Sequence, residues 1–143
     1  MTRRKPRAKY ALEVAPDVQA RIHDLVAKLA LDHVDPNRIV CFRSRGSTAR
    51  IYARIWSLPQ IWQIALGVEA HYAIEVVEAF DRQSMDDQTR TLIHELMHIP
   101  KTFSGALVPH TCFGKRIDCA SVEVLFRAYA ASTPGAPPAP PTG

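Results

Sequence analysis

The first strong hydrophobic pattern in the chain has the period of an α-helix. Apolar residues recur at helical spacing directly after Pro16 and Asp17, two residues that suit a first helical turn. The apolar stripe consists of Val18, Ile22, Leu25, Val26 and Leu29. We therefore expect a helix from this start to about Asp32, packed on the core along one face.

The next segments carry patterns of strands. Residues 49–56, "ARIYARIW", alternate small or aliphatic residues with larger ones, the period of a half-buried strand. Residues 72–80, "YAIEVVEAF", are β-branched and aromatic and predict a further strand. A shorter apolar run in residues 38–47, "RIVCFRSRGS", ends at Gly46, and residues 60–67, "QIWQIALG", fit either a strand or a helix.

Two more helices are expected towards the C-terminus. Ser84 can cap the first of them, with Asp86 and Asp87 at the end of the helix where the dipole favours acids. Pro100 disfavours helical geometry at Ile99, so this helix should end within about a residue of His98. A final helix should begin near Lys115, with one face formed by Ile117, Ser121, Val124, Leu125 and Ala128.

Together these elements predict a single α+β domain. A small mixed sheet would pack on the N-terminal helix, the helix that begins at Ser84 and the C-terminal helix. The chain of 143 residues is long enough for one core. We expect a basic flexible tail at residues 1–12, the folded domain at 13–131 and a proline-rich disordered tail at 132–143.

The composition of the chain limits where the protein can be located and what it can bind. No apolar run is long enough to cross a bilayer, and Glu13 and Pro16 interrupt the only apolar patch near the start. We therefore expect a cytoplasmic protein with no membrane partner.

Three cysteines without paired spacing argue against a disulfide framework. The net charge of +4 is concentrated in the first ten residues and again between Arg43 and Arg54, so nucleic acid is a possible partner; a solvated tail is the simpler interpretation.

The sequence "LIHELMHIP" at residues 92–100 carries the candidate chemistry. His94 and His98 are four residues apart and project from one helical face, so both imidazoles can bind one zinc ion. Glu95 flanks this face, where its carboxylate can take a proton from a water on the metal. This arrangement is the HExxH motif of metallopeptidases. The alternative is an amphipathic helix whose histidines are bound by their protein neighbours.

A catalytic zinc site needs a third protein ligand and an open position for water. His110 follows a loop that Pro100 and Gly105 force to turn back, which makes it the favoured third ligand. Glu123, on the final helix, is the competing candidate, and Asp118 and Glu75 are further carboxylates near the pattern.

Several stretches resemble a metallopeptidase family found in phages and archaea, within the SprT-like zincins. They are "FRSRGSTARIYARIW", "YAIEVVEAFD" and "LIHELMHIPKTFSGALVPH" followed by "FGKRID", and the resemblance covers about residues 30–128. It implies a zincin-like minimal catalytic domain whose edge strand lines the cleft, with zinc held by His94, His98 and His110. Metzincins are a poorer match, because their pattern requires glycine and histidine where this chain has Lys101 and Ser104.

The leading hypothesis is a zinc-dependent endopeptidase in which Glu95 is the general base and the preceding strand holds an extended protein or peptide substrate. Two alternatives stay open. One is a zinc-stabilised module that binds nucleic acid or a partner without catalysis, and the other is a metal-dependent hydrolase of a non-peptide substrate.

Overall fold

The computed structural model describes residues 10–112 and 115–132. Most of the basic tail expected at residues 1–12, and nearly all of the proline-rich tail expected at 132–143, lie outside these residues. Within the described part of the chain, no helix is both long enough and apolar enough to cross a membrane.

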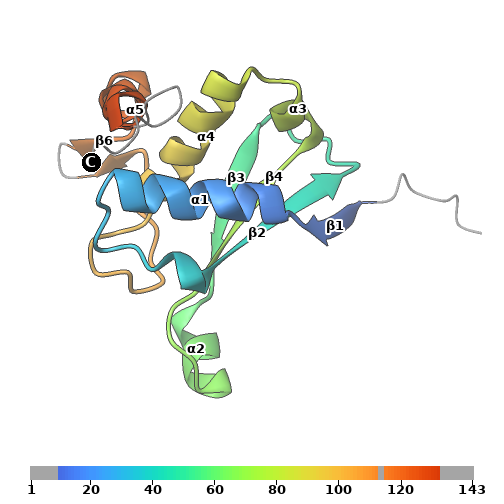
Figure 1. Cartoon of the computed structure of the whole chain (residues 1–143). Helices are drawn as coiled ribbons and strands as arrows, with labels where there is room; N and C mark the ends of the chain where they lie inside the picture. The colour runs from blue at the N-terminus through green and yellow to red at the C-terminus, as the bar shows by residue number, and fades with distance from the viewer. Residues whose placement is uncertain (1–9, 113–114, 133–143) are drawn as a thin grey trace, which may run out of the picture.

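A mixed four-stranded sheet organises the fold (Figure 1). Its strands are β1 (Ala11–Val14), β2 (Ile39–Arg45), β3 (Ala53–Ser57) and β4 (Tyr72–Val76), in the order β1-β2-β4-β3. The two central strands, β2 and β4, run parallel, and each edge strand pairs antiparallel with its neighbour. The expected α+β class with a small mixed sheet is therefore confirmed.

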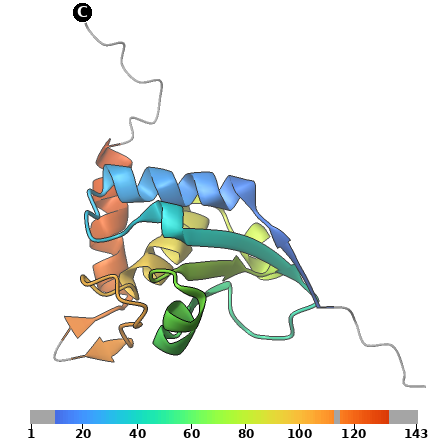
Figure 2. The same cartoon turned by 90° about the horizontal axis from the view of Figure 1, so that it is seen from below.

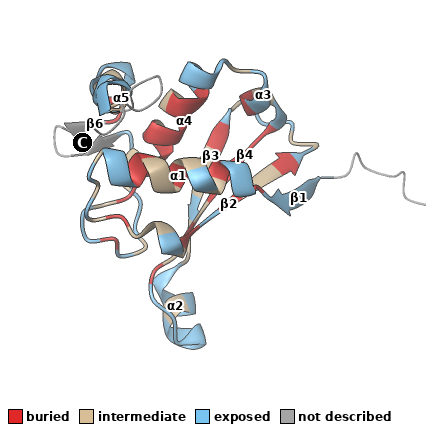
Figure 3. Ribbon diagram, in the orientation of Figure 1, coloured by how far each residue is buried: buried red, intermediate tan, exposed pale blue. Residues whose placement is uncertain are grey.

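Helices α1 (Pro16–Lys28) and α4 (Met85–Met97) supply most of the helical side of the core. Val18, Ile22 and Leu25 of α1 and Leu92 of α4 are buried in the same cluster as Ile74 of β4. Figure 3 shows the buried positions concentrated where these helices meet the sheet. The burial of apolar surface along these stripes is the main favourable contribution to folding.

Helix α1 ends earlier than the apolar stripe predicts. It stops at Lys28 rather than near Asp32, and Leu29 forms its C-cap. Ala30 then adopts a positive φ of 50°, a backbone conformation that cannot continue a right-handed helix. Leu29 still packs against the core, which explains why it fits the stripe although it lies outside the helix.

Several segments differ from their sequence-based interpretation. Strand β1 includes Ala11 and Leu12, which the sequence placed in the tail, because this segment pairs with β2. Residues 60–67, left open between strand and helix, form α2 (Gln60–Leu66), which Gly67 ends in the left-handed conformation. The strand expected at residues 72–80 stops at Val76, and α3 (Glu78–Asp81) follows it. A single 3-10 turn, Pro36–Arg38, precedes β2.

The C-terminal helix α5 (Cys119–Ser132) starts later than predicted. Residues near Lys115 instead belong to a two-stranded ribbon of β5 (Thr111–Cys112) and β6 (Lys115–Arg116). The predicted apolar face was also wrong at Val124, which is 68% exposed. The side chains that pack against the core are Val122, Leu125, Phe126 and Tyr129.

Candidate metal centre and cleft

Helix α4 is placed by signals at both of its ends. The Ser84 hydroxyl accepts a hydrogen bond from the Asp87 amide at 3.1 Å, and His98 forms the C-cap two residues before Pro100. His94 and His98 are half-buried on one face of this helix, and Glu95 is 7% exposed. The helix thus presents two imidazoles and one buried carboxyl group near its C-terminal end.

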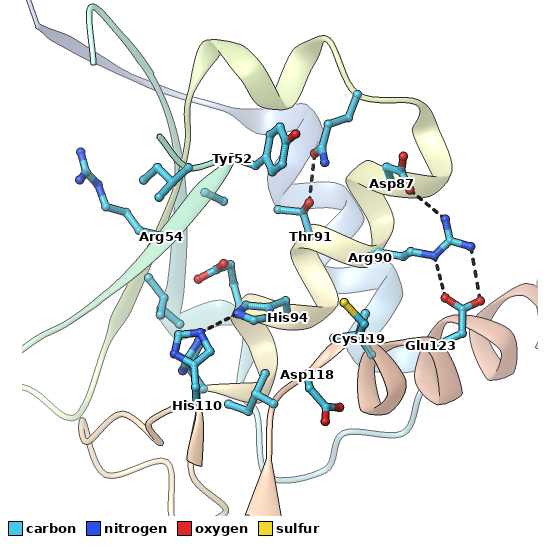
Figure 4. A pocket seen from close by; sticks show the side chains of 18 of the residues that line it. Tyr52, Arg54, Asp87, Arg90, Thr91, His94, His110, Asp118, Cys119 and Glu123 are labelled. Atoms are coloured by element: carbon cyan, nitrogen blue, oxygen red, sulfur yellow. Dashed lines mark hydrogen bonds and ion pairs between the residues drawn. The ribbon is translucent and has the colours of Figure 1, made fainter. Parts of the chain in front are cut away.

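His110 returns to these two histidines after the loop that follows α4. Its Nε2 atom lies 3.1 Å from Nε2 of His94, as Figure 4 shows. Its ring centroid lies 5.1 Å from that of His94 and 4.7 Å from that of His98. Each of the three histidines offers one ring nitrogen, and these three nitrogens lie within 4.8 Å of one another. The loop therefore brings a third imidazole to the helix face.

Hydrogen bonds between His98 and Val108 close the loop that follows α4. The Val108 amide donates to the His98 carbonyl at 2.7 Å, and Nδ1 of His98 hydrogen-bonds the Val108 carbonyl. This second bond assigns the proton of the neutral His98 ring to Nδ1, which leaves Nε2 as the free lone pair. The Ile117 amide also donates to the His110 carbonyl at 3.0 Å, so the segment that carries His110 is held on its far side as well.

Tyr72 of β4 anchors the middle of the same loop from the sheet. Its hydroxyl donates to the Ala106 carbonyl at 2.8 Å and accepts from the Gly105 amide at 2.9 Å. Its ring also packs edge-on against Phe103, with the ring centroids 5.0 Å apart. Tyr72 is 2% exposed, so these bonds are made away from competing water.

The donor set fits a zinc ion. Nitrogen ligands about 2.0 to 2.1 Å from a tetrahedral zinc lie roughly 3.3 Å from one another, close to the observed distance between His94 and His110. Three neutral imidazoles are also a ligand set of catalytic zinc sites, where a fourth position stays open. Among the described residues, this is the group of histidine, cysteine and carboxylate side chains that could hold a metal ion.

The electrostatics of the site favour the neutral forms of His94, His98 and Glu95 in the protein without metal. Burial lowers the pKa of His94, and the neighbouring His98 and His110 lower it further. Burial also lowers the pKa of His98, and this effect, together with that of His110, outweighs the hydrogen bond with the Val108 carbonyl, which raises it. Both rings are thereby kept in the neutral form that binds metal. Burial alone raises the pKa of Glu95 to about 8 in the protein without metal.

The three histidines open onto a large cleft of about 1010 Å³. One wall is formed by residues 51–55, which include the start of the edge strand β3, and the others come from α4, α5 and the loop around Leu107. Strand β4, the last strand of the sheet before α4 in the chain, lies inside the sheet and cannot offer a free edge. The proposal that the preceding strand holds the substrate is therefore wrong in this detail, and β3 is the strand available for that role.

Glu123 lies at the other end of the cleft from the histidines. Its carboxylate accepts hydrogen bonds from Nε and Nη2 of Arg90 at 2.9 and 3.4 Å, and Arg90 also binds Asp87 at 2.9 Å (Figure 4). The Arg90 guanidinium lowers the pKa of Glu123, so this carboxylate has a cationic partner already. Asp118 accepts from the Ser121 amide at the start of α5. Neither carboxylate belongs to the histidine group.

Glu75 is buried on the sheet face that α1 and α4 do not cover. Arg54 binds it through Nε at 2.8 Å and Trp56 through Nε1 at 2.9 Å, and the Tyr10 hydroxyl also donates to it. Burial by itself would raise the pKa of Glu75, but hydrogen bonds from Arg54, Tyr10 and Trp56 lower it to about 2. Glu75 is therefore a structural anion rather than a group of the cleft.

The basic segment between Arg43 and Arg54 is largely occupied by ion pairs. Arg43 binds Asp17 and Asp81, with nitrogen–oxygen distances of 2.9 to 3.0 Å. Arg45 pairs with Glu13, and Arg54 pairs with Glu75. These three arginines hold elements of the fold together through carboxylate partners, so they offer no support for a cationic nucleic-acid surface. The basic residues before Tyr10 lie outside the described residues.

Sequence patterns did not identify Tyr72 and Arg90 as contributors to the site. Tyr72 looked like one apolar position in a strand, and Arg90 looked like a charge on a helix surface. No local sequence signal reveals these roles, because the hydrogen-bond partners are distant in the chain. The partners of Tyr72 lie 33 and 34 residues away, and Glu123 lies 33 residues from Arg90. Tyr52 and Leu107, which line the cleft, were also not singled out.

Comparison with known proteins gives one family. The model of a family described as "Putative phage metallopeptidase" matches residues 10–115, which include all four strands of the main sheet, α4 and His110. No curated protein and no solved structure gives a match to the chain.

Proposed function

Because the chain belongs to the phage metallopeptidase family, we propose that it is a zinc-dependent endopeptidase of the SprT-like zincin type. Family membership indicates a metallopeptidase, and thus a metal ion and a protein or peptide substrate. The identity of the metal, the ligands and the catalytic residue are parts of the proposal.

One observation carries the proposal: three imidazoles converge beside a buried carboxyl group at the wall of the cleft. His94, His98 and His110 would hold the zinc ion, with Glu95 next to it. Bound zinc supplies Lewis-acid chemistry, since it lowers the pKa of water from about 15.7 towards 7 and polarises a carbonyl oxygen.

Glu95 would act as general base and then as proton donor. Its carboxyl group lines the cleft, although its side chain is otherwise buried by neighbours. It takes a proton from the attacking water and passes this proton to the amine that leaves. A nearby cation favours the ionised carboxylate, which offsets the rise in pKa that burial causes in the metal-free protein.

The edge strand β3 would bind the substrate as an additional strand. An edge strand carries backbone groups that have no partner on its outer side, and an extended peptide can pair with them. Because residues 51–55 line the same cleft as the histidines, this pairing would place a peptide bond beside the metal. The cleft walls from Ile51, Ile55 and Val122 would accept apolar side chains.

The two other hypotheses make different demands. A zinc-stabilised binding module needs no base, yet Glu95 is a nearly buried carboxyl group without a cationic partner among the described residues. A hydrolase of a non-peptide substrate would need Glu95 as well. The peptidase is favoured over this alternative by family membership and by the free strand edge in the cleft.

The decisive experiment compares the wild-type protein with Glu95→Gln, using zinc content and cleavage of an unfolded protein as the two measurements. We expect the variant to keep its zinc, since the ligands are unchanged, and to lose activity by about three orders of magnitude or more. Glu78→Gln, an exposed change on α3, is the matched control and should behave as the wild type. Equal cleavage by wild type and Glu95→Gln would contradict the catalytic assignment, and zinc binding without any proteolysis would favour the binding module.

A further inference from the structure

Helix α2 exposes large apolar side chains to an unusual degree. Ile61 and Ile64 are 74% and 75% exposed, and Trp62, Leu66 and Val68 are 54%, 59% and 40% exposed. The helix projects from the body of the molecule, away from α4 and α5, in Figure 1, and Figure 2 views the molecule from the side on which α2 lies. Isolated apolar residues on a surface are common, but five within eight positions form the kind of patch that marks an interaction site.

The helix is nevertheless firmly attached at its base. The Gln63 side chain donates to the Leu58 carbonyl at 2.9 Å, and the Val68 amide donates to the Gln63 carbonyl at 2.9 Å. The Leu58 amide donates to the His71 carbonyl at 3.0 Å, which closes the segment on itself. The apolar side chains are therefore presented on a fixed scaffold.

Neither terminal segment outside the described residues is rich in large aliphatic or aromatic side chains. Residues 1–9 contain five arginines and lysines, and residues 133–143 contain only proline, glycine, alanine and threonine. The segment from Ser57 to Val68 carries no charged side chain at all. A complementary partner is therefore uncharged and rich in large apolar side chains, a composition that neither terminal segment has.

Two walls of the cleft lead directly to α2. Strand β3, which begins in the cleft, ends at Ser57, and only Leu58 and Pro59 separate it from the helix. On the opposite wall, the loop that carries Leu107 touches α2, since the Gln63 amide also donates to the Ser104 carbonyl at 3.3 Å. A polypeptide that extends beyond the C-terminal end of β3 therefore meets the exposed side chains of α2.

We propose that α2 is an exosite that binds an apolar, uncharged segment of the same polypeptide whose scissile bond lies in the cleft. This inference rests on the proposed peptidase function. It narrows the substrate class to unfolded or extended protein with an apolar segment outside the cleaved sequence. Folded proteins bury such segments, so the exosite would select chains that have lost their structure.

The test uses the full chain loaded with zinc and the double variant Ile61→Ser/Ile64→Ser. These residues are three positions apart on one helix face and mostly exposed, so the change should leave the fold intact. Val124→Ser, at a 68% exposed apolar position on α5 outside the cleft lining, is the matched control. The substrates are a reduced and alkylated unfolded polypeptide of about 100 residues and a peptide of about eight residues, which spans roughly 26 Å when extended.

We expect KM for the unfolded polypeptide to rise about tenfold in the double variant while kcat stays unchanged, because burial of the two side chains is lost. The short peptide should be cleaved equally by all three proteins. As a second measurement, the unfolded polypeptide should bind zinc-loaded Glu95→Gln about tenfold more weakly when the α2 changes are added. Unchanged binding and KM would overturn the exosite, and so would equal losses for both substrates.

Sedimentation velocity tests the other possible occupant of the α2 patch, a second copy of this chain. A wild-type dimer that the α2 changes convert to a monomer would show that a second copy of this chain covers the helix, which contradicts the proposal. Failure of the wild type to cleave either substrate would instead overturn the proposed function itself. Cleavage of both substrates with no effect of the α2 changes would overturn only the exosite.

Discussion

The Nε2 atoms of His94 and His110 lie 3.1 Å apart although the two residues are 16 positions apart in the chain. Helical geometry explains the approach of His94 to His98 but not that of His110. The return of His110 depends on the bonds between His98 and Val108 and on the anchor that Tyr72 provides. Changes to these contacts should therefore be visible in metal affinity.

The first prediction concerns the choice of the third ligand. His110→Ala should purify with little zinc and be less stable, because the loss of one of three ligands should weaken binding by more than the 10- to 100-fold typical of outer-shell changes. Glu123→Ala should retain zinc, since Glu123 binds Arg90 rather than the histidine group. Zinc per protein, measured by mass spectrometry after purification, checks both. Zinc loss on changing Glu123 alone would exclude His110 as the ligand.

The second prediction concerns Tyr72. In Tyr72→Phe the loop loses the bonds to Ala106 and Gly105, and we expect zinc affinity to fall about 10- to 100-fold. A competition titration with a chelator measures this. Tyr129→Phe is the control, because its hydroxyl donates to Asp24, far along the chain from the loop between His98 and His110. Both variants should lose about 1 kcal/mol of stability without metal. An equal effect of both changes on zinc affinity would rule out a specific role for Tyr72.

The third prediction uses two glycines with positive φ. At Gly105, with φ of +97°, an added Cβ would lie 2.3 Å from Nε2 of Gln63 and 3.1 Å from the Leu58 carbonyl oxygen. At Gly67, with φ of +67°, it would meet nothing within 4 Å. Gly67→Ala should cost about 1 kcal/mol of unfolding free energy, the conformational cost alone. Gly105→Ala should cost more, up to about 3 kcal/mol, and should also weaken zinc binding.

Urea unfolding of the metal-free proteins and a zinc titration check this pair. If Gly105→Ala is no more destabilising than Gly67→Ala, the close contact between Gly105 and Gln63 of α2 is not a constraint on the fold. If it destabilises without affecting zinc, the loop and the ligand are not coupled.

The fourth prediction concerns pH. The pKa of Glu75 is about 2 in the folded protein and near 4.5 in an unfolded chain, so its ionised form stabilises the fold. This contribution is fully present above about pH 4.5 and is lost as the pH falls towards 2. Glu75→Gln should therefore be less stable by about 2 to 3 kcal/mol at pH 7, with a smaller difference at pH 3. Urea unfolding of metal-free protein at both values provides the measurement, with the exposed Glu78→Gln as the control. A difference that does not change with pH would show that Glu75 acts through packing.

The bounds of helix α4 and the spacing of its histidines were determined by local sequence. A cap at Ser84, acids in the first turn and Pro100 after the end fix the bounds of α4 within a residue or so. Because a helix has one geometry, the separation of four residues places His94 and His98 on one face wherever the helix packs. The family and the α+β class could also be predicted, whereas the roles of Glu95 and the three histidines stay predictions until they are tested.

The arrangement of the other parts was decided only by tertiary structure. The order β1-β2-β4-β3 makes β3 the edge of the cleft, and it arises from pairing between strands distant in the chain. Val124 fits the periodicity of α5 as well as Val122 does, but only the position of the core decides which of them is buried. Tyr72 and Glu75 belong to one strand and face opposite sides, and each acts through partners on other elements. Hydrophobic periodicity records the local period of an element, whereas these roles depend on which element lies beside it, and only the folded chain specifies that.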